Sequence, residues 1–220
     1  MRPKYLLAIL VLLAASLACS LGAPAEPTDP NLLFKDDFSS TSSGWDQSTT
    51  DTGTTDYQDG QYRILVSQPQ YDMWANPKLT SLPADVRVEV DATKASGPEA
   101  NDFGVICRYT ETGSGSDTAY NFYYFMISSD GYAAIGKVQN TEQSFLTDLL
   151  SEPSPAIKSN EVNHIRGDCI GDTLTMYVNG EQLFSIKDSD LTGGDVGLLA
   201  GTFEEAGTEI LFDNFLVTKP

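Results

Sequence analysis

The chain has little of several residues on which common enzymes and nucleic-acid-binding proteins depend. It contains one histidine, His164, and three cysteines among 220 residues. A Ser-His-Asp triad and a histidine-rich metal centre both need imidazole groups, so the sequence argues against either. Lys and Arg number 13 against 31 Asp and Glu, which gives a formal net charge of -18. Because nucleic-acid binding needs clustered basic side chains, this composition argues against a nucleic-acid partner.

Long apolar runs are absent except at the start of the chain. There, two basic residues precede an apolar run over residues 5–17, which ends in the letters SLAC at residues 16–19. The run is too short to cross about 30 Å of hydrocarbon, and small residues precede the cleavage point. These features predict a signal peptide over residues 1–18 and therefore export from the cytoplasm.

The SLAC letters resemble the lipobox of bacterial lipoproteins, in which the cysteine is lipidated and becomes the first mature residue. The resemblance implies that Cys19 carries a lipid, and two acyl chains would give stable anchoring where one chain holds only marginally. Ordinary signal peptidase could also cut here and release a soluble protein. We expect lipidation of Cys19, with the protein anchored to the cell membrane and facing its extracytoplasmic side.

The remaining chain divides into a tether and one domain. Residues 19–31 are small, acidic and rich in proline, which is typical of a stiff linker. Residues 32–219 consist of short β-branched and aromatic runs separated by Gly, Asp, Asn and Pro, with almost no helical periodicity. The sequence predicts an all-β sandwich or jelly roll of two antiparallel sheets. The core strands are predicted at 62–66, 85–92, 103–109, 120–128, 132–138, 162–169, 173–179, 182–186, 196–201 and 208–217.

Two kinds of local signal support this prediction. Asp59-Gly60, Asp130-Gly131 and Asn179-Gly180 each separate two strand-like runs and predict tight hairpins. Only the segment from residue 141 to 157 departs from the pattern, and we expect a turn of helix or a long loop there. Alternation along the other runs predicts which side chains face the core.

Two cysteines fall on the apolar sides of their strands. In the run 103–109, Cys107 alternates with residues on the opposite side, and Cys169 does the same in the run 162–169. Both thiols should therefore face the same interior, and export permits their oxidation. We predict a disulfide between Cys107 and Cys169; the alternative is two buried free thiols that behave as small hydrophobic side chains.

The strand sequences resemble a known group of folds. The segments NDFGVICRY, NFYYFMISSDGYAAIGK, NHIRGDCIGDTLTMYVNGEQL and GDVGLLAGTFEEAGTEILFDNFLV are similar, in that order, to the concanavalin A-like or laminin G-like jelly rolls of bacterial exported proteins. Among these, the chain is most similar to lipoprotein modules related to the 3-keto-disaccharide hydrolase-like group. Such folds carry lectins, hydrolases and adhesive modules, so the activity must be argued from a site.

One strand partly matches a glycosidase pattern. Concanavalin-like glycosidases of the laminarinase type carry Glu-x-Asp-x-x-Glu, and this chain has Glu89 and Asp91 but Lys94 at the last position. Retaining hydrolysis needs two carboxyl groups about 5 Å apart, and lysine cannot replace one. We therefore expect no catalysis by this strand.

A sugar-binding face is easier to support from the sequence. On the polar side of its strand, Trp74 lies with Asp72 and Asn76, while Met73 and Ala75 face inward. Sugars are recognised by aromatic platforms together with groups that offer several hydrogen bonds. The predicted ligand-binding residues are those that share such polar or aromatic positions: Trp74, Arg108, Tyr124, His164 and Arg166. The alternative is that these aromatic residues serve only the core.

The resemblance also implies a cofactor. Jelly-roll carbohydrate modules often hold a structural calcium ion between their first and last strands, and the chain has Asp36 and Asp37 near the first strand and Asp213 near the last. Carboxylate oxygens are suitable Ca²⁺ ligands. The alternative is that these acids are simply solvated, as most acidic side chains are, and no cofactor is required for the predicted function.

Three functions remain open at this point. We favour a non-catalytic extracytoplasmic module that binds carbohydrate or cell-wall glycan. A hydrolase of modified disaccharides would need a cleft with paired carboxylates. A structural or protein-interaction module of the cell envelope would instead present a flat polar face with Trp74 buried.

Overall fold

The computed structural model describes residues 29–148, 150 and 152–220. Residues Asn31–Pro220 form one structural unit, which contains every strand of the described residues. The predicted signal peptide, Cys19 and most of the predicted tether lie outside the described residues. Within the described part of the chain, no helix has the length and apolar character needed to span a bilayer.

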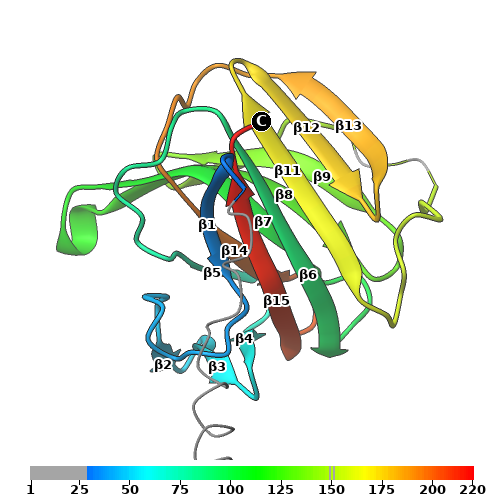
Figure 1. Ribbon diagram of the computed structural model, residues 1–220. Helices are drawn as coiled ribbons and strands as arrows, with labels where there is room; N and C mark the ends of the chain where they lie inside the picture. The colour runs from blue at the N-terminus through cyan, green and yellow to red at the C-terminus, as the bar shows by residue number, and fades with distance from the viewer. Residues whose placement is uncertain (1–28, 149, 151) are drawn as a thin grey trace, which may run out of the picture. The chain divides into compact units, whose positions relative to one another are not determined.

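The domain is built from two antiparallel sheets, as the sequence predicts (Figure 1). The nine-stranded sheet has the order β13-β12-β11-β6-β15-β4-β3-β2, with β1 paired to β15. Its strands are β1 (Leu32–Asp36), β2 (Ser48–Thr50), β3 (Gly53–Gln58), β4 (Gln61–Val66), β6 (Val86–Ser96), β11 (Asn163–Ile170), β12 (Thr173–Val178), β13 (Glu181–Lys187) and β15 (Thr208–Thr218).

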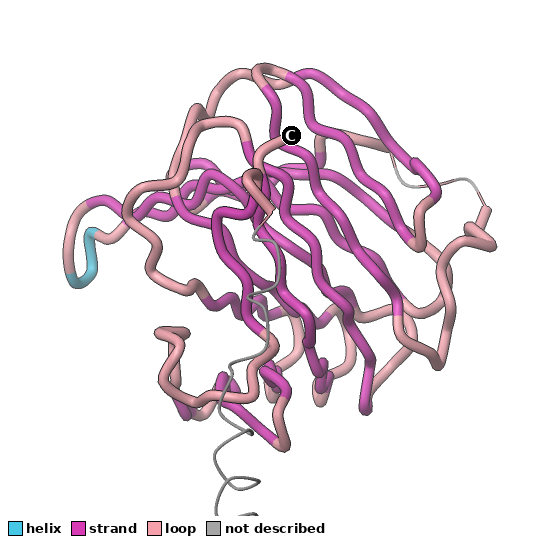
Figure 2. The backbone as a smooth tube through the Cα atoms, viewed as in Figure 1, coloured by secondary structure: helices cyan, strands magenta, loops and turns pink. Residues whose placement is uncertain are grey.

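The six-stranded sheet has the order β10-β9-β8-β7-β14-β5. Its strands are β5 (Tyr71–Ala75), β7 (Asp102–Thr112), β8 (Ala119–Ser128), β9 (Ala133–Gln139), β10 (Glu142–Phe145) and β14 (Asp195–Thr202). A single 3-10 turn, Gly115–Asp117, joins β7 to β8 and is the only helical element among the described residues (Figure 2).

Each of the ten predicted core strands overlaps an observed strand, and four of them extend one residue beyond it. The three predicted hairpins are present. At the turns after β3 and β12, both central residues have positive φ angles, as Asp59 at 52° and Gly60 at 80° illustrate. Such angles match the twist of the flanking strands in a two-residue hairpin. The segment 141–157 contains β10 at its start and no helix in its described residues.

Side chains that alternate along the strands fill the space between the two sheets. Val86, Val88 and Val90 of β6 are buried there, as are Phe103 and Val105 of β7. Close packing needs small residues as well as large ones. A Cβ atom at Gly167 in β11 would lie 2.5 Å from the Phe125 ring, so glycine at this position lets the phenylalanine reach the centre of the core.

A disulfide joins Cys107 of β7 to Cys169 of β11, which confirms the predicted pairing. Both cysteines are completely buried. Because β7 and β11 belong to different sheets, this bond crosslinks the two layers through the core.

Candidate functional site

The outward-facing side of the six-stranded sheet carries a second apolar cluster, separate from the main core. Side chains of β7, β8, β9 and β14 form it, and three aromatic residues, Trp74, Tyr109 and Tyr120, pack against it. The Trp74 ring meets the Tyr120 ring at a centroid distance of 5.0 Å and the Phe122 ring at 5.3 Å. This face is therefore an aromatic platform on an ordered sheet, with Trp74 only partly buried.

Pockets adjoin one another along this platform. The largest, of about 550 Å³, shares Asp46, Tyr109 and Glu111 with a second of about 440 Å³, which Trp74 and Tyr120 also line. The second shares Asp72 with a third of about 400 Å³. The third shares Asp102 and Phe203 with a small apolar pocket of about 220 Å³. We call these four adjoining pockets the groove.

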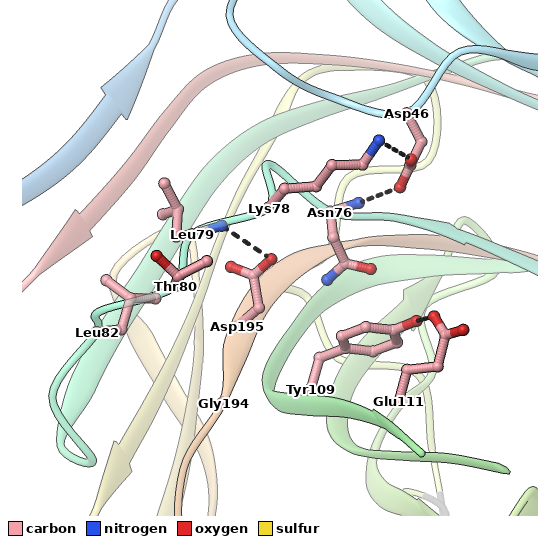
Figure 3. A pocket seen from close by; sticks show the side chains of 10 residues that line it. All are labelled: Asp46, Asn76, Lys78, Leu79, Thr80, Leu82, Tyr109, Glu111, Gly194 and Asp195. Carbon is pink, nitrogen blue, oxygen red and sulfur yellow. Dashed lines mark hydrogen bonds and ion pairs between the residues drawn. The ribbon is translucent and has the colours of Figure 1, made fainter. Parts of the chain in front are cut away.

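Figure 3 shows how polar side chains are arranged at one end of the groove. Lys78 forms an ion pair with Asp46 at 2.8 Å, and the Tyr109 hydroxyl donates a hydrogen bond to Glu111 at 3.2 Å. Asp195 accepts a hydrogen bond from the backbone N–H of Leu79. Burial raises the pKa of Asp195 to about 6. This end of the groove therefore combines hydrogen-bonding groups with the Tyr109 ring.

Two carboxyl groups converge near the middle of the groove. Asp72 of β5 lies opposite Gly201 of β14, and Asp102 begins β7 on the other side of β14. A Cβ atom at Gly201 would lie 2.3 Å from Oδ1 of Asp72 and 2.4 Å from Oδ1 of Asp102. Glycine therefore leaves room for both carboxyl groups to lean over the same point of the sheet.

Neither carboxyl group of this pair is neutralised within the described structure. Asp102 is 5% exposed, and its Oδ1 has no hydrogen-bond partner there. Burial, followed by the charge of Asp72, raises the pKa of Asp102 to about 8. Burial also raises the pKa of Asp72. The pair is therefore disposed to retain a proton near neutral pH.

The five predicted ligand-binding residues do not form one site. Trp74 and Tyr124 lie on the platform, although Tyr124 is only 1% exposed. The Tyr124 ring covers Gly136, and its hydroxyl group donates to the Ser144 carbonyl oxygen at 3.2 Å. His164 and Arg166 lie on β11, which belongs to the other sheet. A ligand in the groove could contact Trp74 but not this pair.

Arg108 does not lie on the polar side of its strand, contrary to expectation. A register shift between Cys107 and Thr110 interrupts β7, and Arg108 has a φ angle of 56°. The bulge turns its side chain inward, where it is 3% exposed. Its guanidinium group donates to the Leu191 and Gly171 carbonyl oxygens at 2.7 and 2.8 Å. Arg108 therefore serves as a structural side chain that connects loops at this end of the sandwich.

His164 is held by two carboxylates on the outer side of the nine-stranded sheet. Nδ1 lies 2.8 Å from Asp91, and Nε2 lies 3.0 Å from Glu89. These are the two acids of the interrupted glycosidase pattern, so the structure gives them an imidazole partner away from the groove. The hydrogen bond to Glu89 and then that to Asp91 raise the pKa of His164 to about 9, against an opposing effect of burial.

This environment gives a direct prediction for His164. A proton NMR titration should place the midpoint of its imidazole signals near pH 9, and the signals are unambiguous because the chain has one histidine. A folded-state pKa above the ordinary value means that protonated His164 stabilises the fold fully below about pH 6.5. That stabilisation is lost as pH rises through 9. A midpoint near 6.5 would show that the carboxylates do not hold the ring.

Arg166 and Asp168 also form an ion pair with one another. Arg166 donates two hydrogen bonds to Asp168, at 2.7 and 2.6 Å, and its guanidinium lies 4.3 Å from the centre of the Tyr177 ring. Asp168 is 4% exposed and also accepts from Arg87. The segment Arg166–Asp168 therefore lies within a paired strand and not at an exposed loop tip.

The three acids predicted to hold calcium each accept a hydrogen bond in the described structure, and Asp213 accepts its bond from the Asn214 backbone N–H at 2.7 Å. Both oxygens of Asp36 accept hydrogen bonds, from the Phe38 backbone N–H and from Trp45 Nε1 at 2.8 and 2.9 Å. Asp37 accepts from the Ser39 hydroxyl group. Across residues 29–148, 150 and 152–220, no group of three His, Cys, Asp or Glu side chains is placed so that it could hold a metal ion. Asp36 instead fixes the Trp45 ring beneath β1.

Sequence reasoning missed Asp102, Tyr109 and Tyr120 as groove residues. Tyr109 ended a predicted strand and Tyr120 began one, but the sequence does not show that the two strands are adjacent. In the structure the two rings stack at 6.4 Å beside Trp74. The alternation along β7 could have indicated the position of Asp102, because Asp102 lies on the same side of the strand as Gly104 and Ile106.

Comparisons with known proteins identify the fold. No family model matches the sequence, and no curated protein matches it. The structure is similar to the carbohydrate-binding module CBM66 from Bacillus subtilis, with a TM-score of 0.51 and 19% identity over 80% of this chain and 96% of that chain. It is also similar to a protein of unknown function with a galectin-like fold from Bacillus subtilis. That comparison gives a TM-score of 0.64 and 12% identity over 86% of this chain and 96% of that chain.

A third similar structure is an enzyme. The β-glucanase of Bacillus licheniformis gives a TM-score of 0.58 and 10% identity over 88% of this chain and 100% of that chain. Identities at this level establish the fold alone. The chain thus has the two-sheet jelly-roll fold that occurs in both carbohydrate-binding modules and glycoside hydrolases.

Proposed function

We propose that this protein is an extracytoplasmic glycan-binding module and that the groove holds the glycan. The observation that carries the proposal is the partly exposed Trp74 ring, set among Tyr109 and Tyr120 along adjoining pockets. A pyranose offers C–H faces to aromatic rings and hydroxyl groups to polar side chains. The groove supplies both, and its linked pockets suit several consecutive sugar residues.

Catalysis is not part of this proposal. Glu89 and Asp91, the acids of the glycosidase-like strand, are bound to His164 on the other sheet. Within the groove, Asp102 is 5% exposed, which leaves little of its carboxyl group open to a glycosidic oxygen. These features favour binding without bond cleavage.

The experiment that tests the proposed function is a screen of the described domain, residues 31–220, on arrayed glycans and cell-wall polymers. We expect retention on at least one glycan class, with competition by the free oligosaccharide. A screen in which no glycan or cell-wall polymer is retained would overturn the proposal.

The proposed location rests on the signal sequence and on the disulfide. Structural disulfides persist in oxidising compartments outside the cytoplasm, and Cys107 and Cys169 form one. We propose that Cys19 is lipidated and anchors the domain to the cell membrane. Metabolic labelling with a radioactive fatty acid should mark the wild-type protein and not the Cys19→Ser variant. Equal labelling of both proteins, or labelling of neither, would contradict the anchor.

A further inference from the structure

Acidic side chains outnumber basic ones in the groove. Six acids line its three larger pockets, namely Asp46, Asp72, Asp102, Glu111, Asp195 and Glu204. Lys78 is the only basic side chain among the described residues that line them, and it is paired with Asp46.

Acids elsewhere on the domain more often have basic partners. On the nine-stranded sheet, His164 contacts both Glu89 and Asp91, and Arg87 and Arg166 both contact Asp168. Such pairs offset the cost of placing carboxylates close together. The groove therefore has an excess of negative charge that the described protein side chains do not balance.

At the Asp72 and Asp102 pair, two of these acidic side chains lie side by side. The two carboxyl groups meet over Gly201, no basic residue contacts either one in the described structure, and Oδ1 of Asp102 has no hydrogen-bond partner. Asp102 is buried beneath the groove, whereas Asp72 is partly open to it. Two carboxyl groups this close share a proton, so an outside cation placed at Asp72 would be attracted to the one negative charge that remains and would lower the cost of burying it.

We propose that the groove binds amine-bearing glycans and that a sugar ammonium group sits against Asp72, above Asp102. The proposal rests on the glycan-binding function and names its ligand class. An ammonium group offers three hydrogen-bond donors and one positive charge, and both match this carboxyl pair. The aromatic rings beside Asp72 would hold the sugar ring itself, since Trp74 and Tyr120 line the same pocket. Anionic glycans would be repelled by the remaining acids.

A matched pair of ligands tests the proposal. β-1,4-linked hexasaccharides of glucosamine and of N-acetylglucosamine have the same backbone and differ in the charge of the amino group. Calorimetry at low salt, below the pKa of the sugar amine, should show at least tenfold tighter binding of the glucosamine hexamer. That preference should shrink as salt is added, because exposed charges are screened.

Variants locate the effect within the groove. Asp72→Asn should reduce affinity for the glucosamine hexamer about tenfold, and Glu181→Gln, an exposed acid on β13 of the other sheet, should leave it unchanged. Asp102→Asn should also weaken binding, and its amide can donate a hydrogen bond to Asp72 so that the variant can fold. If Asp102→Asn does not fold, Asp72→Asn alone tests the proposal. Asp72 is only partly buried, so we expect this variant to fold.

Four results would overturn the proposal. They are equal affinity for the two hexamers, equal effects of Asp72→Asn and Glu181→Gln, binding of neither hexamer, and cleavage of the glucosamine hexamer with loss of cleavage in Asp72→Asn. Retention of other glycans in the screen would leave the proposed function standing in each of the first three cases. Failure of the ligand class and failure of glycan binding are thus distinguishable.

Discussion

Replacing Cys107 and Cys169 together by alanine is expected to lower the free energy of unfolding by about 2–4 kcal/mol. The bond joins two residues that are 62 positions apart in the sequence, and it restricts the conformations available to the unfolded chain between them. Both sulfur atoms are completely buried, so their removal also leaves unfilled space between the sheets. The effect would be a large part of the stability of an ordinary domain.

Guanidinium unfolding of the wild type and of the double variant measures this difference. The wild type in strong reductant provides the control, because it loses the crosslink and keeps both sulfur atoms. We expect the reduced wild type to be less stable than the oxidised protein and somewhat more stable than the double variant. Unfolding midpoints that coincide for all three samples would show that the bond does not stabilise the fold.

Replacing Trp74 by alanine is expected to weaken glycan binding at least tenfold, or about 1.4 kcal/mol, at whichever glycan the screen identifies. The ring is partly exposed and packs against Tyr120 and Phe122, so it can contact a sugar without rearrangement. Truncation also removes packing on the outer face. We therefore expect a moderate loss of stability, smaller than that caused by loss of the disulfide.

The matched control for this experiment is Tyr177→Ala. Tyr177 is an aromatic residue on the outer side of the other sheet, where it lies beneath the Arg166 guanidinium. Its removal should leave the dissociation constant for the glycan unchanged within twofold. If Trp74→Ala binds as the wild type does, the groove is not the binding surface.

The main strands could be predicted from sequence because burial imposes alternation. Val86, Val88 and Val90 repeat every second residue, and turns such as Asn179-Gly180 mark the ends of hairpins. β10 was not predicted, since its four residues are all exposed at a sheet edge and carry no apolar alternation. The Asp59-Gly60 hairpin implied a strand at the position of β3, but the bounds of β3 were not predicted, because its sequence GTTDYQ is mostly polar.

The candidate site was harder to predict because it depends on which strands are neighbours. Trp74 and Asp72 were assigned to the correct side of their strand, but their partners on β7 and β8 come from distant parts of the chain. Arg108 was misplaced because alternation fails at a bulge that the sequence does not announce. His164 and Arg166 have the predicted outward orientation, but on the opposite sheet.

The position of β1 bears on how the protein would carry mechanical load. β1 follows the proposed tether directly and pairs with β15, which is hydrogen-bonded to β6, and β6 to β11. Tension entering at Leu32 would therefore spread through the nine-stranded sheet. From β11 it could pass through the sulfur–sulfur bond to β7, which borders the groove. The disulfide would then connect the sheet that follows the tether to the sheet that carries the groove, so that pulling on a bound polymer would not slide the two sheets apart.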